Sequence, residues 1–383
     1  MAQTLVTDMF LPAFPSIAAF FAVPDAFIQY SLSAVTMGGA IGFFIAGPLS
    51  DSLGRRRPIL ASLVLFSLAS YLLYLAPNIE IFVMLRFFQG LAGAAAAVIA
   101  QAIIRDLFVG DAMIRMLGRV WLISGLAPII SPVIAAQLLL TGDWRVVAIA
   151  LGVLGTLILA VSSKALVETL HLDNRRAKGF DGVSRRFLAV FKDRIILGLV
   201  LIGIVQTLAL FSYLNNLPFL YQNTFGLSPV EFSLLFSLGA VSWFTGIQIG
   251  AFIGRIYKPQ WVIFAALVLA GFSGVALYFA GIGSAPLWVV VALVSMFIFT
   301  FGLGITPIST IALQGHGSEA GTAASVMGVL NSFTAAVGAP LYPLVGSASS
   351  ANLGLAIAIT HVIAIVVFFV VLRPKSVPEL IKE

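Results

Sequence analysis

The sequence contains no cysteine, and only 9% of its 383 residues are charged. Without cysteine the chain forms no disulfide, no thiolate nucleophile and no cysteine-based metal site. A charge content this low, combined with 60% hydrophobic residues, excludes an ordinary water-soluble domain. We therefore expect a multi-pass membrane protein, whose length reflects a number of membrane spans rather than of globular domains.

Motifs of several enzyme classes are also missing. The sequence has no Gly-x-x-x-x-Gly-Lys nucleotide loop, no Gly-x-Ser-x-Gly nucleophile elbow and no His-Glu-x-x-His pair. His316 and His361 stand apart from other metal-ligating residues, so we expect no metal site and no bound cofactor. These observations predict that the protein is not an enzyme.

The positive charges follow an asymmetric pattern. A net charge of +6 might suggest a nucleic-acid partner, but the basic residues lie in short loops between apolar segments, so we expect none. If the amino terminus is cytoplasmic, all but Arg86 and Arg145 of the 21 lysines and arginines fall on the cytoplasmic side. The positive-inside rule therefore predicts a multi-pass membrane protein with both termini in the cytoplasm.

Twelve apolar segments, each of about 20 residues or more, can cross a hydrocarbon layer of ~30 Å as helices. The predicted fold is therefore an all-α membrane protein. A polar stretch at 168–194 separates six spans from six, and predicts an N-terminal bundle (1–167), a cytoplasmic linker without a binding role (168–194) and a C-terminal bundle with a short tail (195–383). The spans are 1–22, 28–50, 57–76, 79–103, 116–140, 144–167, 195–222, 228–252, 260–282, 286–312, 320–346 and 350–372.

The two halves resemble each other weakly. Leu11-Pro12 in the first span precedes Gly47 at nearly the same spacing as Leu217-Pro218 precedes Gly250, which opens Gly250-x-x-x-Gly254-Arg255. Such a repeat predicts two pseudo-symmetric six-helix bundles. In transporters built from repeats of this kind, the substrate site lies between the halves near the middle of the membrane.

Two ionisable residues, Asp8 and Arg86, lie deep inside predicted spans. Charges at such depth are unfavourable and usually functional. Asp8 is expected roughly 20 Å from the outer end of the first span, at 1.5 Å per residue. There proton binding and substrate binding could compete, or Asp8 could be structural and paired with a helix end or Arg86. Arg86 is a permanent positive charge. It could lower the pKa of a nearby carboxyl group, pair with an anionic group of a substrate, or hold helices together.

Uncharged polar residues are the remaining candidates. Several could line a polar patch in an apolar cavity, although each taken singly is better explained as structural. Small residues and two prolines in the fifth span favour close helix packing, which alone would explain them. The cavity candidates are Tyr30, Gln101, Gln206, Tyr213, Asn215, Asn216, Trp243 and Asn331, and those of the fifth span are Gly118, Ala127, Pro128 and Pro132.

A charged hairpin joins the second and third spans. In Gly47-x-x-x-Asp51-x-x-Gly54-Arg55-Arg56, the glycines permit a tight turn and close packing, and Asp51 can accept hydrogen bonds at a helix end. The spacing resembles the loop between helices 2 and 3 of major facilitator superfamily transporters. The alternative is a hairpin that only fixes the topology.

Further motifs resemble the Bcr/CflA drug-resistance branch of that superfamily. They are Thr7-Asp8-Met9-Phe10-Leu11-Pro12-Ala13-Phe14-Pro15, Leu85-Arg86-x-x-Gln89-Gly90, Arg105-Asp106, Trp144-Arg145 and Gly226-Leu227-Ser228. The resemblance implies a major facilitator fold, with twelve helices in two bundles, and a monomer in the lipid bilayer of the bacterial inner membrane. It also implies export of hydrophobic drug-like molecules in exchange for protons, by alternating access and without a cofactor.

The same resemblance implies roles for single residues. Asp8 would take part in proton coupling and substrate recognition, and Arg86 would support the coupling. Asp51, Arg55 and Asp106, with Gly47, Gly54 and Arg56, would form a cytoplasmic latch against the start of helix 11 near Ser318 and Glu319.

Two features depart from this branch. Its fifth helix has Gly-x-x-x-Gly-Pro-x-x-Gly, whereas this chain has Ala127, Ser131, Pro132 and Ala135. Only seven residues precede Asp8, so the first span is expected to be truncated. The alternatives to drug export are a proton-coupled metabolite transporter working by export or uptake, a membrane-embedded sensor or enzyme, and an inactive remnant.

Overall fold

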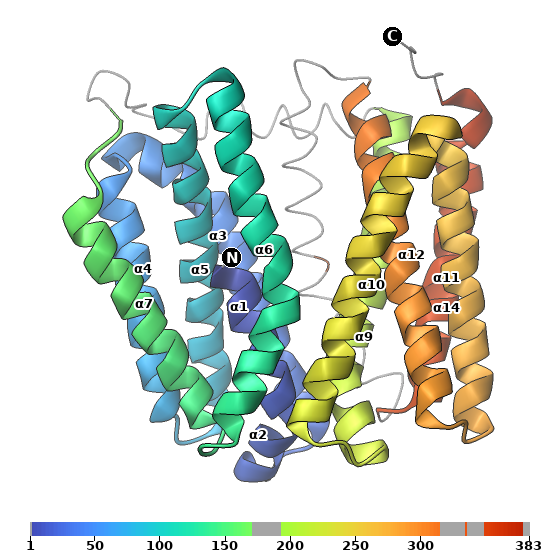
Figure 1. Ribbon diagram of the computed structural model, residues 1–383, viewed down its shortest axis with the longest axis horizontal. Helices are drawn as coiled ribbons and strands as arrows, with labels where there is room; N and C mark the ends of the chain where they lie inside the picture. Colours follow the sequence, from blue (N-terminus) through green and yellow to red (C-terminus); the bar gives the residue numbers. More distant parts are fainter. Residues whose placement is uncertain (1, 171–192, 315–333, 335–347, 378–383) are drawn as a thin grey trace. The chain divides into compact units, whose positions relative to one another are not determined.

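A computed structural model describes residues 2–170, 193–314, 334 and 348–377 (Figure 1). Within these ranges all regular secondary structure is helical, and 10 helices are long and apolar enough to cross a membrane. The protein is therefore a multi-pass membrane protein. It divides into two compact units, Met1–Asp181 with Leu227–Leu234 and Gly182–Gly226 with Leu235–Glu383.

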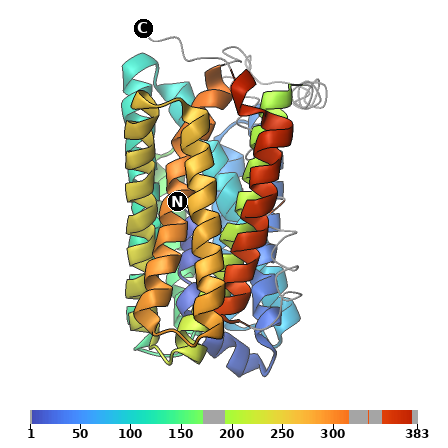
Figure 2. The same ribbon diagram turned by 90° about the vertical axis from the view of Figure 1, so that its right-hand side faces the viewer.

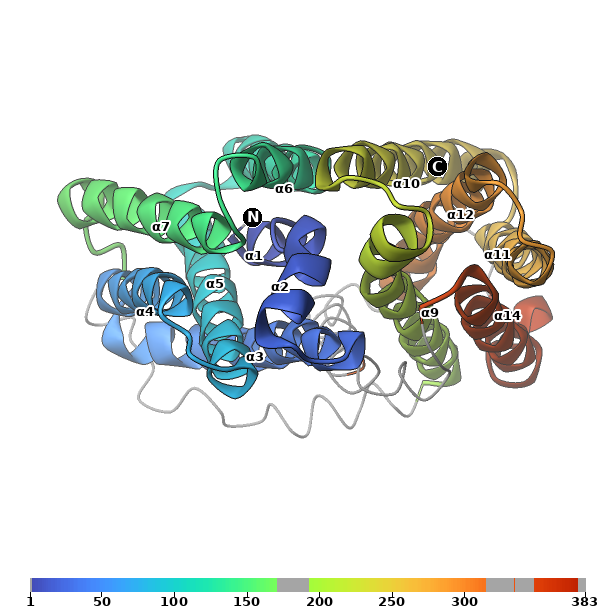
Figure 3. The ribbon, with the colours of Figure 1, turned by 90° about the horizontal axis from the view of Figure 1, so that it is seen from below.

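The first unit is built around α5. This helix contacts α1, α3, α4 and α6, while α4 also packs on α7. Seen along the helices, α1 lies between α6 and α3 (Figure 3). The elements are α1 (Ala2–Asp8), the 3₁₀ turn η1 (Leu11–Ala13), α2 (Phe14–Phe21), α3 (Asp25–Leu53), α4 (Arg56–Tyr74), α5 (Ile79–Leu107), α6 (Gly110–Leu139) and α7 (Arg145–Ala165).

The second unit has a comparable set of long helices. In it α11 packs on α12 and α14, and α14 packs on α9 (Figure 2). The elements are α9 (Arg194–Phe219), the π-helical turn η3 (Leu220–Thr224), α10 (Pro229–Ile256), α11 (Pro259–Ile282), α12 (Leu287–Gln314), α14 (Ser350–Val367), the π-helical turn η5 (Phe368–Leu372) and the 3₁₀ turn η6 (Pro374–Ser376).

Ten of the predicted spans coincide with these helices, because uninterrupted apolar runs of this length are a strong signal for spanning helices. The predicted span 320–346, with the candidate Asn331 and the latch partners near Ser318 and Glu319, lies outside the described residues. Most of the predicted linker also lies outside them.

The prediction of one continuous helix over 1–22 was wrong. After α1 the chain makes the short turn η1 and then begins α2, with Pro12 in the turn and Pro15 in the first turn of α2. Proline has no amide hydrogen and clashes with the preceding helical turn. Near the break, Phe10 N–H bonds the Thr7 carbonyl at 3.3 Å instead of the Val6 carbonyl. The carbonyl of Val6 is thus released from the helix.

Glycines set the closest helix contacts in each unit. A Cβ atom on Gly38 or Gly42 of α3 would overlap the backbone of α5, and one on Gly90 of α5 would overlap the Val35 carbonyl. Such glycines allow two helix backbones to touch. In the second unit the same relation holds between α10 and α12, through the glycines Gly246, Gly250 and Gly302.

This packing changes the predicted repeat. Gly250 lies against the Leu303 carbonyl, as Gly42 lies against the Leu91 carbonyl. By contact, Gly250 therefore corresponds to Gly42 and not to Gly47, with which the sequence spacing aligned it. No described atom lies within 4 Å of a Cβ built on Gly47.

Candidate functional site

Arg86 is completely buried in the first unit and links three of its helices. Its Nη1 donates to the Val6 carbonyl at 2.9 Å and to Gln89 Oε1 at 3.0 Å. Gln89 Nε2 in turn donates to Ser70 Oγ of α4 at 2.7 Å. The guanidinium also lies 4.3 Å from the centre of the Phe10 ring, a cation–π contact.

The helix break explains how Arg86 is held. In a continuous helix the Val6 carbonyl would accept the Phe10 amide, but that amide bonds Thr7 instead. The released carbonyl then accepts the guanidinium. Arg86 Nε and Nη2 have no hydrogen-bond partner among the described residues. Two donors of a buried cation are thus available for a further group.

Asp8 is the last residue of α1 and is 6% exposed. Its Oδ2 finds no hydrogen-bond partner among the described residues. The ion pairs found in the described part of the chain do not join Asp8 to Arg86, so the alternative of a structural Asp8–Arg86 pair finds no support. The first unit therefore buries a carboxyl group and a guanidinium group, each with unused hydrogen-bonding capacity.

A second charged cluster forms where α3 meets α4. Arg55 is buried, and its Nη1 lies 2.5 Å from Asp51 Oδ1 and 2.7 Å from Ser50 Oγ, while its Nε lies 2.8 Å from Asp106 Oδ2. Burial alone would lower the pKa of Arg55, but the bonds to Asp106 and Asp51 outweigh it and raise this pKa. The structure thus brings Asp51, Arg55 and Asp106 together around one permanently charged group.

Glu168 completes this cluster and was missed by the sequence analysis, which gave residues 168–194 no binding role. Its carboxylate accepts the backbone N–H of Arg55 at 2.7 Å and of Arg56 at 3.2 Å. These are free donors at the start of α4, where an anion is favourable. Nearby, the Thr169 hydroxyl donates to Asp106 Oδ2 at 3.1 Å. The beginning of the predicted linker is therefore part of the charged cluster.

Three other residues of the hairpin have distinct roles. Arg56 donates from Nε to the Leu166 carbonyl at 2.9 Å and from Nη2 to the Ser163 carbonyl at 2.8 Å, so it caps α7 instead of joining the carboxylates. Gly54 follows α3 with φ of 87°, a conformation that favours glycine. Gly47 has open space around it, so the expected close packing is not found among the described residues.

Four polar candidates of the second unit, Gln206, Tyr213, Asn215 and Asn216, are deeply buried, whereas Trp243 is half-buried. The centre of the Tyr213 ring lies 6.1 Å from the ring centre of Phe236 and 6.2 Å from that of Phe297. Asn215 Nδ2 donates to the Phe211 carbonyl at 2.9 Å, and its Oδ1 is buried without a partner among the described residues. These two are held by their own unit, and Asn215 keeps one free acceptor.

The remaining candidates are described within the unit to which each belongs. Asn216 Nδ2 donates to the Ser349 carbonyl at 3.5 Å. Gly302 of α12 faces Trp243, whereas Gly304 faces the buried Gln206. Tyr30 and Gln101 belong to the first unit, and Tyr30 is 37% exposed. Each unit therefore contributes buried or half-buried polar groups, and their joint role in a cavity stays a prediction.

The small residues of the fifth predicted span lie on α6, which contacts α1 and η1. The helix continues through Pro128 and Pro132, and Ser131 Oγ donates to the Ala127 carbonyl at 2.5 Å. Gly118 has open space around it among the described atoms. This geometry places Ala127 in the buried part of α6, and close packing explains it.

The start of α7 carries a third cluster that sequence reasoning recorded only as a motif. Arg145 pairs with Asp143 at 2.8 Å, donates to the Tyr74 carbonyl at 3.0 Å and lies 4.2 Å from the Phe20 ring centre. Trp144 is buried beside it. This cluster fixes the end of α2 against α4 and α7.

A membrane fold of two helical units with buried charges is typical of polytopic transporters, and comparison with known proteins agrees. The profile of the Major Facilitator Superfamily matches residues 1–343. The chain belongs to this superfamily, whose members are transporters of small molecules and not enzymes.

Several relatives have been identified by sequence. The MFS-type transporter YdgK of Bacillus subtilis is 31% identical over 94% of this chain and 90% of its own. A bicyclomycin resistance protein homologue of Haemophilus influenzae is 27% identical over 89% and 85%, and the multidrug resistance protein MdtL of Shewanella oneidensis is 26% identical over 86% and 83%. These relatives support a place in the drug:proton antiporter branch.

Solved structures agree with the fold. A D-xylose–proton symporter superimposes with a TM-score of 0.78 at 16% identity, covering 99% of this chain and 97% of that protein. A bacterial homologue of the human lysosomal transporter Spinster gives 0.76 at 14% identity, covering 98% and 94%. At these identities the likeness concerns the fold alone, which is the predicted major facilitator fold.

Proposed function

We propose that this protein exports hydrophobic, drug-like molecules across the bacterial inner membrane in exchange for protons. Asp8 is the proton-binding residue, and Arg86 is the fixed positive charge that supports the exchange. The observation that carries the proposal is the buried Asp8 carboxyl group with an unpartnered oxygen at the break in the first span. A carboxyl group in this position is a membrane-embedded ionisable site, which is functional by default.

The chemistry of the site fits exchange of a proton for a substrate. When Asp8 carries a proton it is neutral, and when it loses the proton it can attract a cationic or hydrogen-bonding substrate group. Arg86 remains charged throughout because a guanidinium does not release its proton under cellular conditions. Its two unpartnered donors can receive a polar group of the substrate. Proton and substrate then compete for one region of the first unit.

The charged cluster of Asp51, Arg55, Asp106 and Glu168 is proposed to lie on the cytoplasmic side, with both termini. The excess of lysine and arginine in the corresponding loops supports this orientation. We propose that the cluster steadies the state that is open to the outside, and that the protein works as a monomer. The aromatic and polar groups of α9 and α10 would contribute to substrate binding.

The test uses proteoliposomes that enclose a pH-sensitive dye. Addition of a hydrophobic cation should cause proton release with the native protein, while Asp8→Asn should abolish it and Asp8→Glu should retain part of it. Asp111→Asn, at an exposed position in the first turn of α6, is the matched control and should exchange normally. Undiminished pH-dependent exchange by Asp8→Asn would remove Asp8 from the mechanism.

The direction of transport separates export from uptake. Under an imposed proton gradient, an antiporter moves substrate against the direction of proton flow, whereas a symporter accumulates it with the protons. Accumulation of metabolites together with protons, and no movement of hydrophobic cations, would contradict drug export. It would favour a proton-coupled metabolite transporter.

A further inference from the structure

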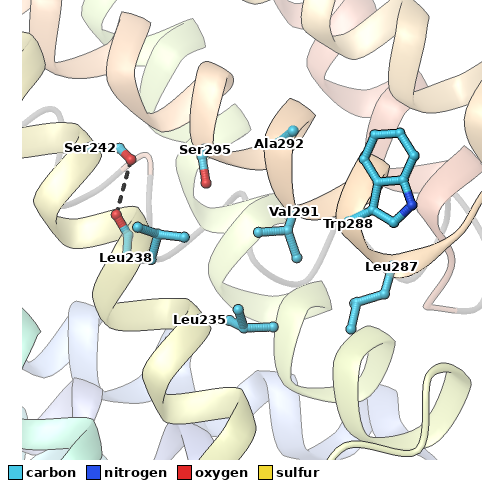
Figure 4. A pocket seen from close by; sticks show the side chains of 8 residues that line it. All are labelled: Leu235, Leu238, Ser242, Leu287, Trp288, Val291, Ala292 and Ser295. Atoms are coloured by element: carbon cyan, nitrogen blue, oxygen red, sulfur yellow. Dashed lines mark hydrogen bonds between the residues drawn. The ribbon is translucent and has the colours of Figure 1, made fainter.

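The second unit contains an apolar groove between α10 and α12. Its volume is about 440 Å³, within the range of small-molecule sites. The lining is hydrocarbon apart from the Trp288 indole and two serine hydroxyls (Figure 4). The lining residues are Leu235, Leu238 and Ser242 of α10, and Leu287, Trp288, Val291, Ala292 and Ser295 of α12.

The groove follows from how these two helices pack. At Gly246, Gly250 and Gly302 the backbones of α10 and α12 touch. About two turns nearer to the start of α10, the lining residues Leu235 and Leu238 are large, and the two backbones are no longer in contact there. Close contact at one end and bulky side chains at the other leave an open furrow between the helices. The same glycines therefore fix the depth at which the groove ends.

The groove lies on an exposed, apolar face of two membrane-spanning helices, a face that suits the hydrocarbon of the bilayer. Both helices are membrane spans, and Leu238 and Trp288 are 47% and 73% exposed. Trp288 lies in the first turn of α12, at the depth where tryptophan favours the membrane interface. From Leu235 to Ser242 the groove runs about 10 Å along the helix, or about two-thirds of one leaflet of ~15 Å. Its length therefore suits a chain that enters from the interface.

The polar groups of the lining favour an apolar occupant. Ser242 Oγ donates to the Leu238 carbonyl at 3.0 Å, as serines inside helices commonly do, so this hydroxyl is satisfied within its own helix (Figure 4). The Trp288 indole sits at the mouth, where an N–H can meet an ester or phosphate oxygen. A hydrocarbon chain with a polar group at one end matches this arrangement, in which apolar side chains line the groove and the indole N–H lies at its mouth.

We propose that the α10–α12 groove binds one acyl chain of a membrane phospholipid, with the glycerol end of the lipid beside Trp288. The bilayer does not leave such a furrow empty, since a void forfeits dispersion contacts. Lipid tails are as apolar as the lining, so the preference arises from shape and packing and is modest. This proposal does not depend on which substrate the protein transports.

The test is photolabelling in nanodiscs of phosphatidylethanolamine and phosphatidylglycerol. A phosphatidylethanolamine with a diazirine in its acyl chain is activated, and labelled peptides are located by mass spectrometry. We expect the segments 235–242 and 287–295 to be labelled about threefold more than exposed parts of α11, a modest excess because lipid tails gain no hydrophobic energy in the groove. Leu238→Trp fills the groove and should remove this excess.

The matched control is Leu269→Trp, which makes the same change at an exposed position of α11 outside the groove. It should leave the labelling of 235–242 unchanged, and both variants should melt at the temperature of the native protein. Even labelling of all exposed helix faces, or groove labelling that persists in Leu238→Trp, would overturn the proposal.

Two further outcomes would assign the groove to another occupant. Saturable displacement of the label by tetraphenylphosphonium would make it a route for hydrophobic substrates. Because the chain has no native cysteine, Ala292→Cys provides a single thiol in the groove. Efficient disulfide-linked dimers of this variant in membranes would make the groove an interface between two copies. Either result contradicts a lipid site.

Discussion

Arg86 Nη1 lies 2.9 Å from the carbonyl oxygen of Val6, a backbone group that is available only because the first span is interrupted at Phe10. The guanidinium replaces the amide that a continuous helix would have supplied. Conformation and charge are thus linked, since rewinding α1 would return Val6 to the helix and take one acceptor from a buried cation.

Replacement of Arg86 by lysine keeps the charge but loses the planar fork that reaches Val6 and Gln89 together. We expect transport by Arg86→Lys to fall at least about tenfold, as the loss of one charge-assisted hydrogen bond of ~1.5 kcal/mol or more implies. Uptake into everted vesicles measures this. Arg145→Lys, at the start of α7, is the control and should remain active. An active Arg86→Lys protein would show that a point charge suffices.

Glycine contacts give a matched pair of substitutions. Gly90→Ala places a methyl group on the Val35 carbonyl, and we expect it to destabilise the first unit by about 3 kcal/mol or more. Gly47→Ala enters open space within α3 and should change stability by no more than about 1 kcal/mol, through helix propensity. Thermal unfolding in detergent measures both. If Gly47→Ala is stable but inactive, Gly47 serves the transport cycle instead of the fold.

Glu168 should stabilise the start of α4. Glu168→Gln removes the anion that accepts two backbone N–H groups, and we expect a loss of about 1 kcal/mol, comparable to that of a helix cap. Glu80→Gln, at an exposed position in the first turn of α5, is the control and should have a smaller effect. Equal melting temperatures for the two variants would mean that the Glu168 contact contributes little.

Asp106→Asn weakens the bond from Arg55 Nε while leaving Asp51 in place. We expect a loss of stability of about 1 kcal/mol, because the pair is only partly shielded from solvent, together with slower transport. Because folding raises the pKa of Arg55, its contribution to stability is fully present below the pKa of the unfolded state. This contribution is lost only as the pH rises through the raised pKa of the folded state, far above neutral pH. Melting temperatures across the neutral range should therefore show no step from Arg55. Such a step would show that Arg55 loses its proton near neutral pH, which contradicts its place as a permanent charge in this cluster.

Much of the fold could be predicted from the sequence, because long apolar runs have few alternatives to spanning helices. Asp51 and Arg55 are also close in sequence, and an acidic and a basic residue one helical turn apart commonly meet. The bond from Arg55 to Asp106 joins residues far apart in sequence and was expected only from resemblance to a known family. The structure adds the distances at which these three residues meet.

Other features could not be read from the sequence for physical reasons. Glu168 is one of several charges in a polar stretch without periodicity, so nothing marks it as the residue that reaches α4. The break at Pro12 was missed because hydropathy is insensitive to backbone hydrogen bonds. The role of Gly250 depends on which helix it touches, and sequence spacing alone aligned it with Gly47.

The interrupted first span is also attached at two separate places. α1 is held through the Val6 carbonyl by Arg86 of α5, whereas α2 is held by its rings, with Phe20 and Phe21 each 5.8 Å from Trp144. Neither attachment involves the other half of the span. Both halves nevertheless meet at Phe82 of α5, whose ring centre lies 6.0 Å from that of Phe10 and 5.8 Å from that of Phe21. A displacement of α1 would therefore reach α2 through α5 as well as through the turn η1.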